Sequence, residues 1–384
     1  MKLSSLRFAT TSLLMALNIG LLLIGGLSLW AGILTIMVLK TALDELIGDS
    51  KPDEGAAPAW LLDMLAMAAL PLLLVNSILF AHYFSSAEHT WLGGMLARIG
   101  IDFDATRQAT TAFHLVGATM SMGALYGLGL NTTHELIHRT TDPVATTVAR
   151  WLGALSCESG FTLHHMAVHH VNAGLYEEPG TSRRGESVYA FIWRATIGAN
   201  RQGFILECER LKRRGLPLWS WHNRFLTGQA MTVAIAVLYY LCGGWPAVGA
   251  FLVVSFQGHF FLEAAGYVEH FGLVRAPGTR FEARHAWNSY RAVSNSILYN
   301  LAYHAHHHLY ASRPYYELRR DEGAPVLPHG YMTMFALSLI PPLYFRVMQP
   351  HLDNWDRNYA TEAELRYLRA HGKRVWEPTP APAE

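Results

Sequence analysis

The chain has 384 residues, of which 51% are hydrophobic and only 15% are charged. Soluble domains carry about 25% charged residues, so this composition argues against a soluble protein and favours one embedded in a membrane. The net charge of +1 gives no global field of the kind that nucleic-acid-binding proteins use. The three cysteines, Cys157, Cys208 and Cys242, are too far apart for a disulfide framework or a Cys-x-x-Cys site.

Six apolar segments are predicted to cross a bilayer, which takes about 20 mostly apolar residues per helix. In chain order they cover residues 11–24, 27–40, 59–80, 110–130, 227–242 and 245–267. Gly25-Gly26 and Gly243-Gly244 each divide a long apolar stretch, so we interpret each stretch as two spans in a tight hairpin. For the first stretch, the alternative is one long tilted helix.

Positive charge predicts the orientation of these spans. Lys and Arg are enriched on the cytoplasmic side, and the most basic segment runs from Arg139 to Arg224. Lys2 and Arg7 place the N-terminus on that side too, so an even number of spans precedes residue 131. The sequence therefore predicts an all-α integral membrane protein with six transmembrane helices.

The polar segments 131–226 and 268–330 are expected to form a cytoplasmic helical cap on these spans. We expect one membrane domain over residues 1–348 and a cytoplasmic C-terminal tail over 349–384, disordered from Trp376. Tyr331–Met348 is apolar but contains Pro341-Pro342, so we interpret it as an interfacial segment and not as a seventh span.

The chain has 20 histidines, and nine of them lie in clusters at the ends of predicted spans. The clustered residues are His134 and His138 in NTTHELIHR, His165, His169 and His170 in LHHMAVHH, His270 in YVEHFGL, and His304, His307 and His308 in YHAHHHLY. Packing neutral imidazoles together without a metal would leave ring nitrogens unpaired, so the clusters predict a multi-histidine metal site.

Helical spacing suggests how these side chains share metals. Residues four apart lie on one helix face, so His134 pairs with His138 and His165 pairs with His169. His170 would then point aside toward a second centre. Two further histidines, His164 and His306, neighbour the clusters and have no assigned role.

The number of imidazoles bears on the identity of the metal. Nine are too many for one ion, and zinc sites usually close at four ligands or use three ligands and water. A dinuclear redox metal fits the number, and we favour iron, while spacing leaves manganese and copper open. The predicted fold thus includes a His-rich dinuclear site on the cytoplasmic side.

Two alternatives start from other features of the sequence. HELIH matches the H-E-x-x-H pattern of zinc metalloproteases, in which the glutamate is the general base, but it leaves the other histidine clusters unexplained. In the two-metal interpretation, Glu135 instead orients a ligand imidazole. A metal transporter would need ionisable residues along the inside of the spans, but only His114, His259 and Glu263 qualify, and the histidine boxes lie at span ends instead.

The histidine boxes, in this order and with spans between them, resemble the integral-membrane di-iron hydroxylases and desaturases. The closest resemblance is to the membrane alkane monooxygenase family, with its xylene and cymene methyl monooxygenase relatives. The matching stretches are LNTTHELIHR, HMAVHH, EEPGTSRRGES, YVEHFGL, AWNSYRAVSNS and HAHHHLYASRPYYELR. The resemblance runs from about Thr110 to Tyr359 and implies that the nine clustered histidines bind two non-haem iron ions. The chain departs from the alkane branch at His164, where that branch has Glu, and at His306, which replaces an Asp.

The resemblance also implies the reaction. We expect O2-dependent hydroxylation of a terminal methyl group of a hydrophobic small molecule, with an alkane giving a 1-alkanol. The alternatives are an aryl-methyl (xylene/cymene-type) monooxygenase and then a fatty acid desaturase, although the spacing in HMAVHH favours the hydroxylase branch.

Electrons must come from outside the chain. The sequence has no G-x-G-x-x-G that opens a helix after a strand and too few cysteines for an iron–sulfur module, so we expect neither NAD nor FAD to bind it. The resemblance implies a separate rubredoxin or ferredoxin with an NAD(P)H reductase. Lys212, Arg213 and Arg214 are a candidate dock for an acidic carrier, although the positive-inside rule explains these charges equally well. The expected location is the inner (cytoplasmic) membrane, with both termini and the metal site on the cytoplasmic side and no nucleic-acid partner.

Overall fold

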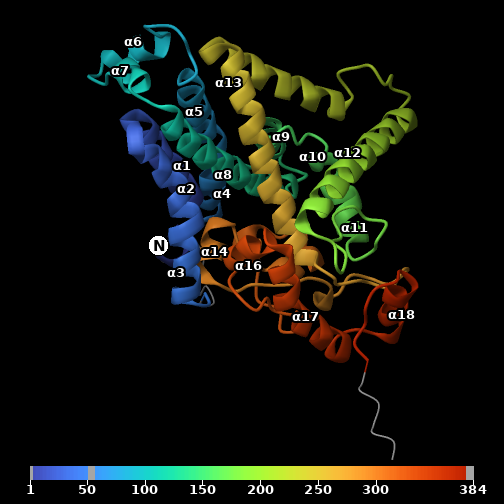
Figure 1. Cartoon of the computed structure of the whole chain (residues 1–384). Helices are drawn as coiled ribbons and strands as arrows, with labels where there is room; N and C mark the ends of the chain where they lie inside the picture. Colours follow the sequence, from blue (N-terminus) through green and yellow to red (C-terminus); the bar gives the residue numbers. More distant parts are fainter. Residues whose placement is uncertain (1–2, 51–56, 378–384) are drawn as a thin grey trace, which may run out of the picture.

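The computed structural model of the chain describes residues 3–50 and 57–377, and the fold within these ranges is helical (Figure 1). Extended pairing among these residues is limited to two isolated bridges, Asp49 with Arg291 and Asn288 with Val326. Five helices of the described chain are long and apolar enough to cross a bilayer. They are Leu6–Ile24, Gly26–Ile47, Ala59–His82, Ala112–Ile137 and Arg224–His270.

The first two of these helices form the predicted hairpin. The chain leaves α1 (Thr10–Ile24) at Gly25, where φ is 72°, a backbone conformation that only glycine adopts readily. The return helix comprises η2 (Gly26–Trp30), α2 (Ala31–Ile33), the π-helical segment η3 (Leu34–Leu39) and α3 (Lys40–Ile47). Its end lies beyond the predicted residue 40 because the last turn is tied to the cap. Asp44 is buried there and accepts hydrogen bonds from the backbone N–H and hydroxyl of Ser294.

The next two candidate spans carry the chain toward the first histidine box. One comprises α4 (Ala59–Met67) and α5 (Ala69–His82), and the other is α8 (Ala112–Ile137), with the short helices α6 (Trp91–Ala97) and α7 (Phe103–Gln108) between them. The predicted end of the fourth span at residue 130 is too early. α8 continues through NTTHELI, so the first histidine box lies on the last turns of the helix and not in a segment that follows it.

The last predicted pair of spans forms two helices that meet at a kink and together carry the label α13 (Arg224–His270), as the glycine pair predicted. Its backbone leaves the helical region at Gly243 and Gly244, with φ of −146° and 67°, and Figure 1 shows the two halves diverging from this bend. A side chain at Gly243 would collide with the backbone oxygen of Ala81, 2.2 Å from the position of an added Cβ. This close approach explains why the bend requires glycine. Counted as continuous helices, the described chain therefore has five candidate spans in place of the six expected.

The predicted polar segments fold as the helices of the cap, of which α16, α17 and α18 lie at the bottom of Figure 1. Before α13 they are α9 (Pro143–Leu155), α10 (Phe161–His164), the π turn η4 (His165–His169), α11 (His170–Asn172) and α12 (Val188–Arg213). After α13 they are η5 (Ala283–His285), α14 (Ala292–Ile297), α15 (His304–Leu309), η6 (Tyr315–Glu317), α16 (Tyr331–Ser338), α17 (Pro341–Asn358) and α18 (Glu362–Ala370). α13 packs against α8, α12, α9 and α16, so it joins the bundle to this cap.

The C-terminal region packs on the cap, whereas the sequence predicted a separate tail from residue 349 onward. α17 runs across that expected boundary, and the side chains of Trp355 and Leu368 are fully buried. Arg184, which precedes α12, forms two hydrogen bonds to the carboxylate of Asp356, at 2.7 and 2.9 Å. The disorder expected from Trp376 concerns mainly residues 378–384, which lie outside the described residues.

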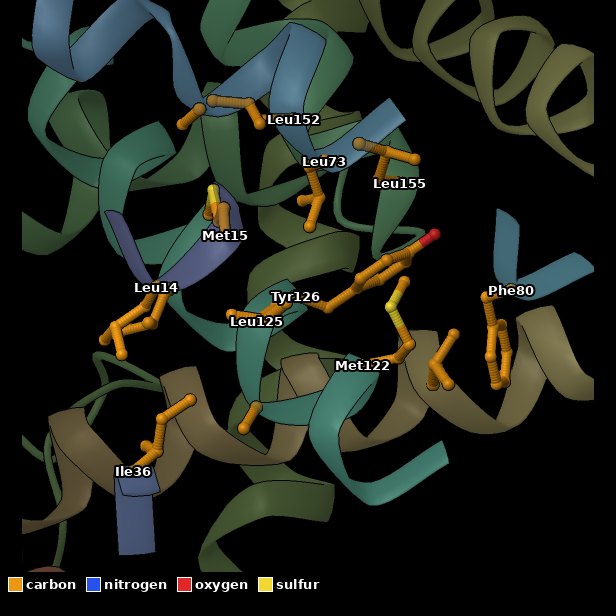
Figure 2. Close-up of a cluster of buried hydrophobic side chains, with 14 of the residues drawn as sticks. Leu14, Met15, Ile36, Leu73, Phe80, Met122, Leu125, Tyr126, Leu152 and Leu155 are labelled. Carbon is orange, nitrogen blue, oxygen red and sulfur yellow. The ribbon is translucent and has the colours of Figure 1, made fainter. Parts of the chain in front are cut away.

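The apolar core of the bundle lies where α1, α5, α8 and α9 meet (Figure 2). Leu14 and Met15 of α1, Leu73 of α5 and Leu125 of α8 are among its buried side chains. Where the helices face water, burial of such side chains is driven by the hydrophobic effect. Inside a bilayer, close van der Waals packing between the helices stabilises the bundle instead. This rigid bundle fixes α8 and α13, the two long helices that end in histidines.

Candidate metal centre

The nine clustered histidines gather at the cap end of the bundle in two adjoining groups. Within each group, one ring nitrogen of every member lies within 4.8 Å of those of the others. The five-histidine group consists of His134, His138, His165, His170 and His307, and the four-histidine group consists of His169, His270, His304 and His308. The rings of His170 and His308, one from each group, have centroids 4.4 Å apart. The structure thus provides two buried sites, side by side, that could hold two metal ions.

The ring nitrogens are arranged as metal ligands are. The Nε2 atom of His165 lies 3.2 Å from that of His138 and 3.0 Å from that of His170. In the other group, the Nε2 atom of His304 lies 3.0 Å from those of both His270 and His308. A metal–nitrogen bond of about 2.1 Å with ligands at right angles separates neighbouring nitrogens by about 3.0 Å. The spacing therefore fits two ions, each held by several imidazoles.

The direction in which the rings point supports the same interpretation. The Nε2 atoms converge in six of the histidines: His138, His165, His170, His270, His304 and His308. A neutral imidazole has one donor and one acceptor nitrogen, so several rings turned toward one point cannot all pair with one another. A metal accounts for this convergence, and the opposite ring nitrogens are left to orient the imidazoles.

The division of the second histidine box differs from the prediction. His165 pairs with His170 in the five-histidine group, whereas His169 belongs to the four-histidine group. The reason is the π turn η4, in which the backbone N–H of His170 bonds to the oxygen of His165, five residues earlier. This wider turn brings residues five apart to one side, so the predicted pairing of His165 with His169 is wrong.

The other boxes follow regular helical spacing. His134 and His138, four residues apart at the end of α8, share the five-histidine group, as predicted. On α15, His304 and His308 are also four apart and share the four-histidine group, while His307 faces the other group. α15 therefore contributes to both sites.

Two buried glutamates contact imidazoles of the four-histidine group. A carboxylate oxygen of Glu178 lies 3.3 Å from the Nδ1 atom of His169, and one of Glu269 lies 3.4 Å from the Nδ1 atom of His304. The hydroxyl of Tyr331 donates to Glu269 at 2.9 Å. A carboxylate on the second ring nitrogen fixes the tautomer and orientation of an imidazole. The sequence carried a signal for both glutamates, because Glu178 lies in EEPGTSRRGES and Glu269 directly precedes His270.

Glu135 does not have the expected contact with an imidazole among the described residues. Its carboxylate pairs with Arg139 at 3.2 Å and accepts a hydrogen bond from the backbone N–H of Tyr315. Arg139 in turn pairs with Asp63 at 2.5 Å. Glu135 thus joins the end of α8 to α4 and η6. The prediction relied on its position next to His134 in the sequence, but adjacent residues of a helix point in different directions.

The remaining histidines near the centre have other partners. His164 accepts or donates a hydrogen bond with the side chain of Gln202 at 3.0 Å, and His306 lies against the ring of Tyr310. The Nδ1 atom of His259 lies 2.7 Å from the carboxylate of Glu158. None of these three histidines belongs to either group.

Burial keeps most cap imidazoles neutral, which is the form that binds metals. Desolvation lowers the pKa of His138 to about 4 and lowers the pKa values of His165, His304, His307 and His308 well below the usual range. His169 is the exception. Burial lowers its pKa, but the charge and hydrogen bond of Glu178, together with the charges of Glu269 and Glu263, outweigh burial, so the net shift is upward.

Glu178 shows the complementary shift. Burial raises its pKa, but His169 and hydrogen bonds from the surrounding chain outweigh burial and hold it at about 2. The His169–Glu178 pair therefore brings a negative charge next to the four-histidine group, and a metal cation would take the place of the proton on His169.

Three neighbouring cavities, which share wall residues, lie at or near the histidines. The histidine cavity, of about 70 Å³, has His134, His165, His169 and His304 in its wall. The apolar pocket, of about 60 Å³, lies between α8, α13, α14 and α16. Its wall consists of Ile36, Met37, Ala124, Gly127, Leu128, Asn131, Phe261, Leu262, Ala265, Ile297, Leu298, Leu301, Tyr331, Met332 and Phe335.

The walls of these cavities share residues. Leu262, Ala265 and Leu301 line both the histidine cavity and the apolar pocket. A third, narrow space, the junction cavity, lies between Asn131, Leu301, His134 and His307 and their neighbours. Leu301 lines all three, so its side chain lies between the apolar pocket and the histidines that border the other two cavities.

Known proteins are similar to this chain over most of its length. The fatty acid desaturase family matches residues 109–338. An alkane 1-monooxygenase of Pseudomonas aeruginosa is 33% identical over 84% of this chain and 82% of its own length. An alkane 1-monooxygenase of Alcanivorax borkumensis is 36% identical over 68% of each chain. The xylene/toluene monooxygenase hydroxylase component XylM of Pseudomonas putida is 30% identical over 69% of this chain and 72% of its own length. The chain therefore belongs to the fatty acid desaturase family, in the branch of membrane monooxygenases that includes the alkane 1-monooxygenases and XylM.

Proposed function

We propose that this protein is an O2-dependent, non-haem di-iron monooxygenase that hydroxylates a terminal methyl group, with an alkane converted to a 1-alkanol. The balanced reaction takes an alkane, O2, two electrons and two protons to the alcohol and water. The observation that carries the proposal is an apolar pocket that shares wall residues with the cavities beside two groups of imidazoles. A hydrocarbon forms no hydrogen bonds, so a protein can recognise it only through an apolar pocket of matching shape.

We infer that the nine grouped histidines are the metal ligands, five for one iron and four for the other. Imidazole is a ligand that iron accepts, and the family to which the chain belongs supports iron over other redox metals. Bound iron would supply the redox chemistry that activates O2. Glu178 and Glu269 would hold His169 and His304 in position for binding.

The residues of the chain supply positioning and exclusion of water. Leu301 lies where the three cavities meet, so a chain in the apolar pocket would reach the histidines past this side chain with one end first. This geometry favours attack at a terminal carbon. Burial of the histidines keeps water away from the reacting carbon.

An aryl-methyl substrate of the xylene type is the second candidate. The observation that favours it is the 30% identity to XylM over 72% of that protein. Phe261 and Phe335, whose rings stack 5.1 Å apart in the wall of the apolar pocket, would also suit an aromatic ring.

Electrons are proposed to come from a separate rubredoxin or ferredoxin with an NAD(P)H reductase. The basic residues Lys212–Arg214 lie about 20 Å along α12 from Ala199, which lines the histidine cavity. His170 is partly exposed and Val171 is 60% exposed, so the surface beside them lies much closer to the centre. This distance disfavours Lys212–Arg214 as the point where electrons enter.

The membrane arrangement is part of the proposal. We infer six crossings, with the two halves of α13 counted separately on either side of the Gly243–Gly244 bend. The positive-inside rule supports the inner membrane, with both termini and the histidine groups on the cytoplasmic side.

Metal and product analysis test the proposal. We expect the purified protein to contain two irons per chain and, with reductase and carrier, to convert n-octane mainly to 1-octanol. Octane, p-xylene and a fatty acid should be compared side by side, and preferred oxidation of p-xylene to its benzylic alcohol would favour the second candidate. Zinc in place of iron, or mainly subterminal alcohols from octane, would contradict the proposal.

A further inference from the structure

Asn131 is the unexplained polar group of the apolar pocket. Its side chain is 5% exposed, and neither its amide nitrogen nor its amide oxygen has a hydrogen-bond partner among the described residues. Its neighbours on α8 differ, because the hydroxyls of Thr132 and Thr133 donate to backbone oxygens one turn earlier. Leaving a buried amide without partners costs free energy, so this side chain calls for a partner from outside the chain.

The position of Asn131 identifies the place where that partner binds. Asn131 lines both the apolar pocket and the junction cavity, and it precedes His134 by three residues, on the same face of α8. His134 and His307 border the junction cavity. The amide therefore lies at the end of the apolar pocket that adjoins the five-histidine group, where an oxygen atom is added under the proposed function.

The surroundings define the chemistry of the partner. Asn131 and Tyr331 are the polar residues of the pocket wall, and the hydroxyl of Tyr331 is already bonded to Glu269 at 2.9 Å. The wall of the apolar pocket contains no charged side chain, and the one carboxylate of the junction cavity, Glu135, is already paired with Arg139. A carboxylate or an ammonium group on the ligand would therefore be buried without a free counter-charge, at high cost. An amide offers one acceptor and two donors, and a neutral hydroxyl group can use both kinds.

We propose that Asn131 is a hydroxyl-binding residue that holds the oxygen-bearing end of a primary alcohol at the histidine end of the apolar pocket. The identification of that alcohol as the reaction product rests on the proposed function. An alkane cannot bond to the amide, whereas the alcohol made from it can. Asn131 thus favours retention of the product over binding of the substrate.

Equilibrium binding to the purified protein in lipid nanodiscs tests this proposal. The probes are radiolabelled 1-octanol, n-octane and 1-fluorooctane, each corrected for its partition into empty nanodiscs. In the wild type we expect 1-octanol to bind more tightly than 1-fluorooctane. In Asn131→Leu we expect the affinity for 1-octanol to fall about 3- to 10-fold, while the affinity for n-octane stays the same or rises.

Two controls separate this role from a structural one. Asn131→Leu removes an unpartnered amide, so its thermal midpoint should not fall and its iron content should not change. Asn76→Leu is the matched control, because the Asn76 amide lies outside the pocket walls and is bonded to Met15, Leu72 and Asn18. That variant should lose stability while keeping the wild-type preference for 1-octanol over n-octane.

Equal changes in the affinities for 1-octanol and n-octane in Asn131→Leu would overturn the proposal, as would equal binding of 1-octanol and 1-fluorooctane by the wild type. If Asn131→Leu does not accumulate, Asn131→Ala removes the same amide with less bulk. Binding requires no turnover, so a protein that fails to hydroxylate octane but shows this selectivity would contradict the proposed function and leave the hydroxyl-binding role standing.

Discussion

The two histidine groups lie side by side but differ in what surrounds them. The four-histidine group has carboxylates on two of its imidazoles, from Glu178 and Glu269. The five-histidine group has one more imidazole, and the glutamate nearest to it in the sequence, Glu135, pairs with Arg139 instead. Anionic partners make an imidazole a stronger donor, so under the proposed function two of the imidazoles in the smaller group would be the stronger metal ligands. The five-histidine group, in turn, adjoins the end of the apolar pocket.

Removal of one ligand from each group should have the largest effect. We expect His169→Ala and His307→Ala to abolish hydroxylation and each to lower the iron content of the purified protein. Metal analysis together with product formation from n-octane measures this. His371→Ala, at an exposed histidine on the C-terminal side of α18, is the matched control, and full iron with full turnover in both ligand variants would defeat the assignment.

Removal of the carboxylates should separate the two groups. We expect Glu178→Gln to reduce iron affinity or activity about 10- to 100-fold, because the amide no longer places a negative charge on His169. Glu135→Gln should leave iron binding closer to that of the wild type and instead lower the thermal midpoint, because it breaks the pair with Arg139. Iron titration and thermal unfolding of both variants make the comparison, and a greater loss of iron affinity in Glu135→Gln would reverse our account.

The C-terminal helix supports the same side of the centre. His285 of η5 bonds to Glu364 of α18 at 2.7 Å, and the ring of Phe281, just before η5, stacks on His308 with centroids 4.6 Å apart. Glu364→Gln should therefore lower the free energy of unfolding by about 2 kcal/mol at neutral pH, with little effect on the five-histidine group.

This contribution should depend on pH. Burial raises the pKa of Glu364, but hydrogen bonds from His285, Thr361 and Arg284 outweigh burial and hold it at about 2, below the ordinary 4.5. Folding thus favours the ionised form. The contribution of Glu364 to the free energy of unfolding is therefore complete above about pH 4.5 and is lost as the pH falls toward 2. Thermal midpoints of the wild type and Glu364→Gln measured across this range should converge at the acid end, and a constant difference would contradict the assignment.

Much of the centre could be predicted from residue spacing. His134 and His138 share one group because four residues make about one turn of a regular helix, and the concentration of histidines at span ends already indicated two metals. The candidate spans followed from apolar length, and their breaks followed from glycine pairs, because these are properties of local sequence. Spacing did not reveal the π turn, which places His170 and not His169 in the same group as His165.

The sequence by itself determined that this protein is membrane-embedded, helical and supplied with nine clustered imidazoles. The tertiary structure decided how the nine divide between two groups, and it placed Glu178 and Glu269 against His169 and His304. It also decided that Asn131 lies without a protein partner at the end of an apolar pocket. The physical reason is range. Composition and helical period act within a few turns of chain, whereas a widened turn, a carboxylate contact and a pocket wall depend on which distant segments pack together.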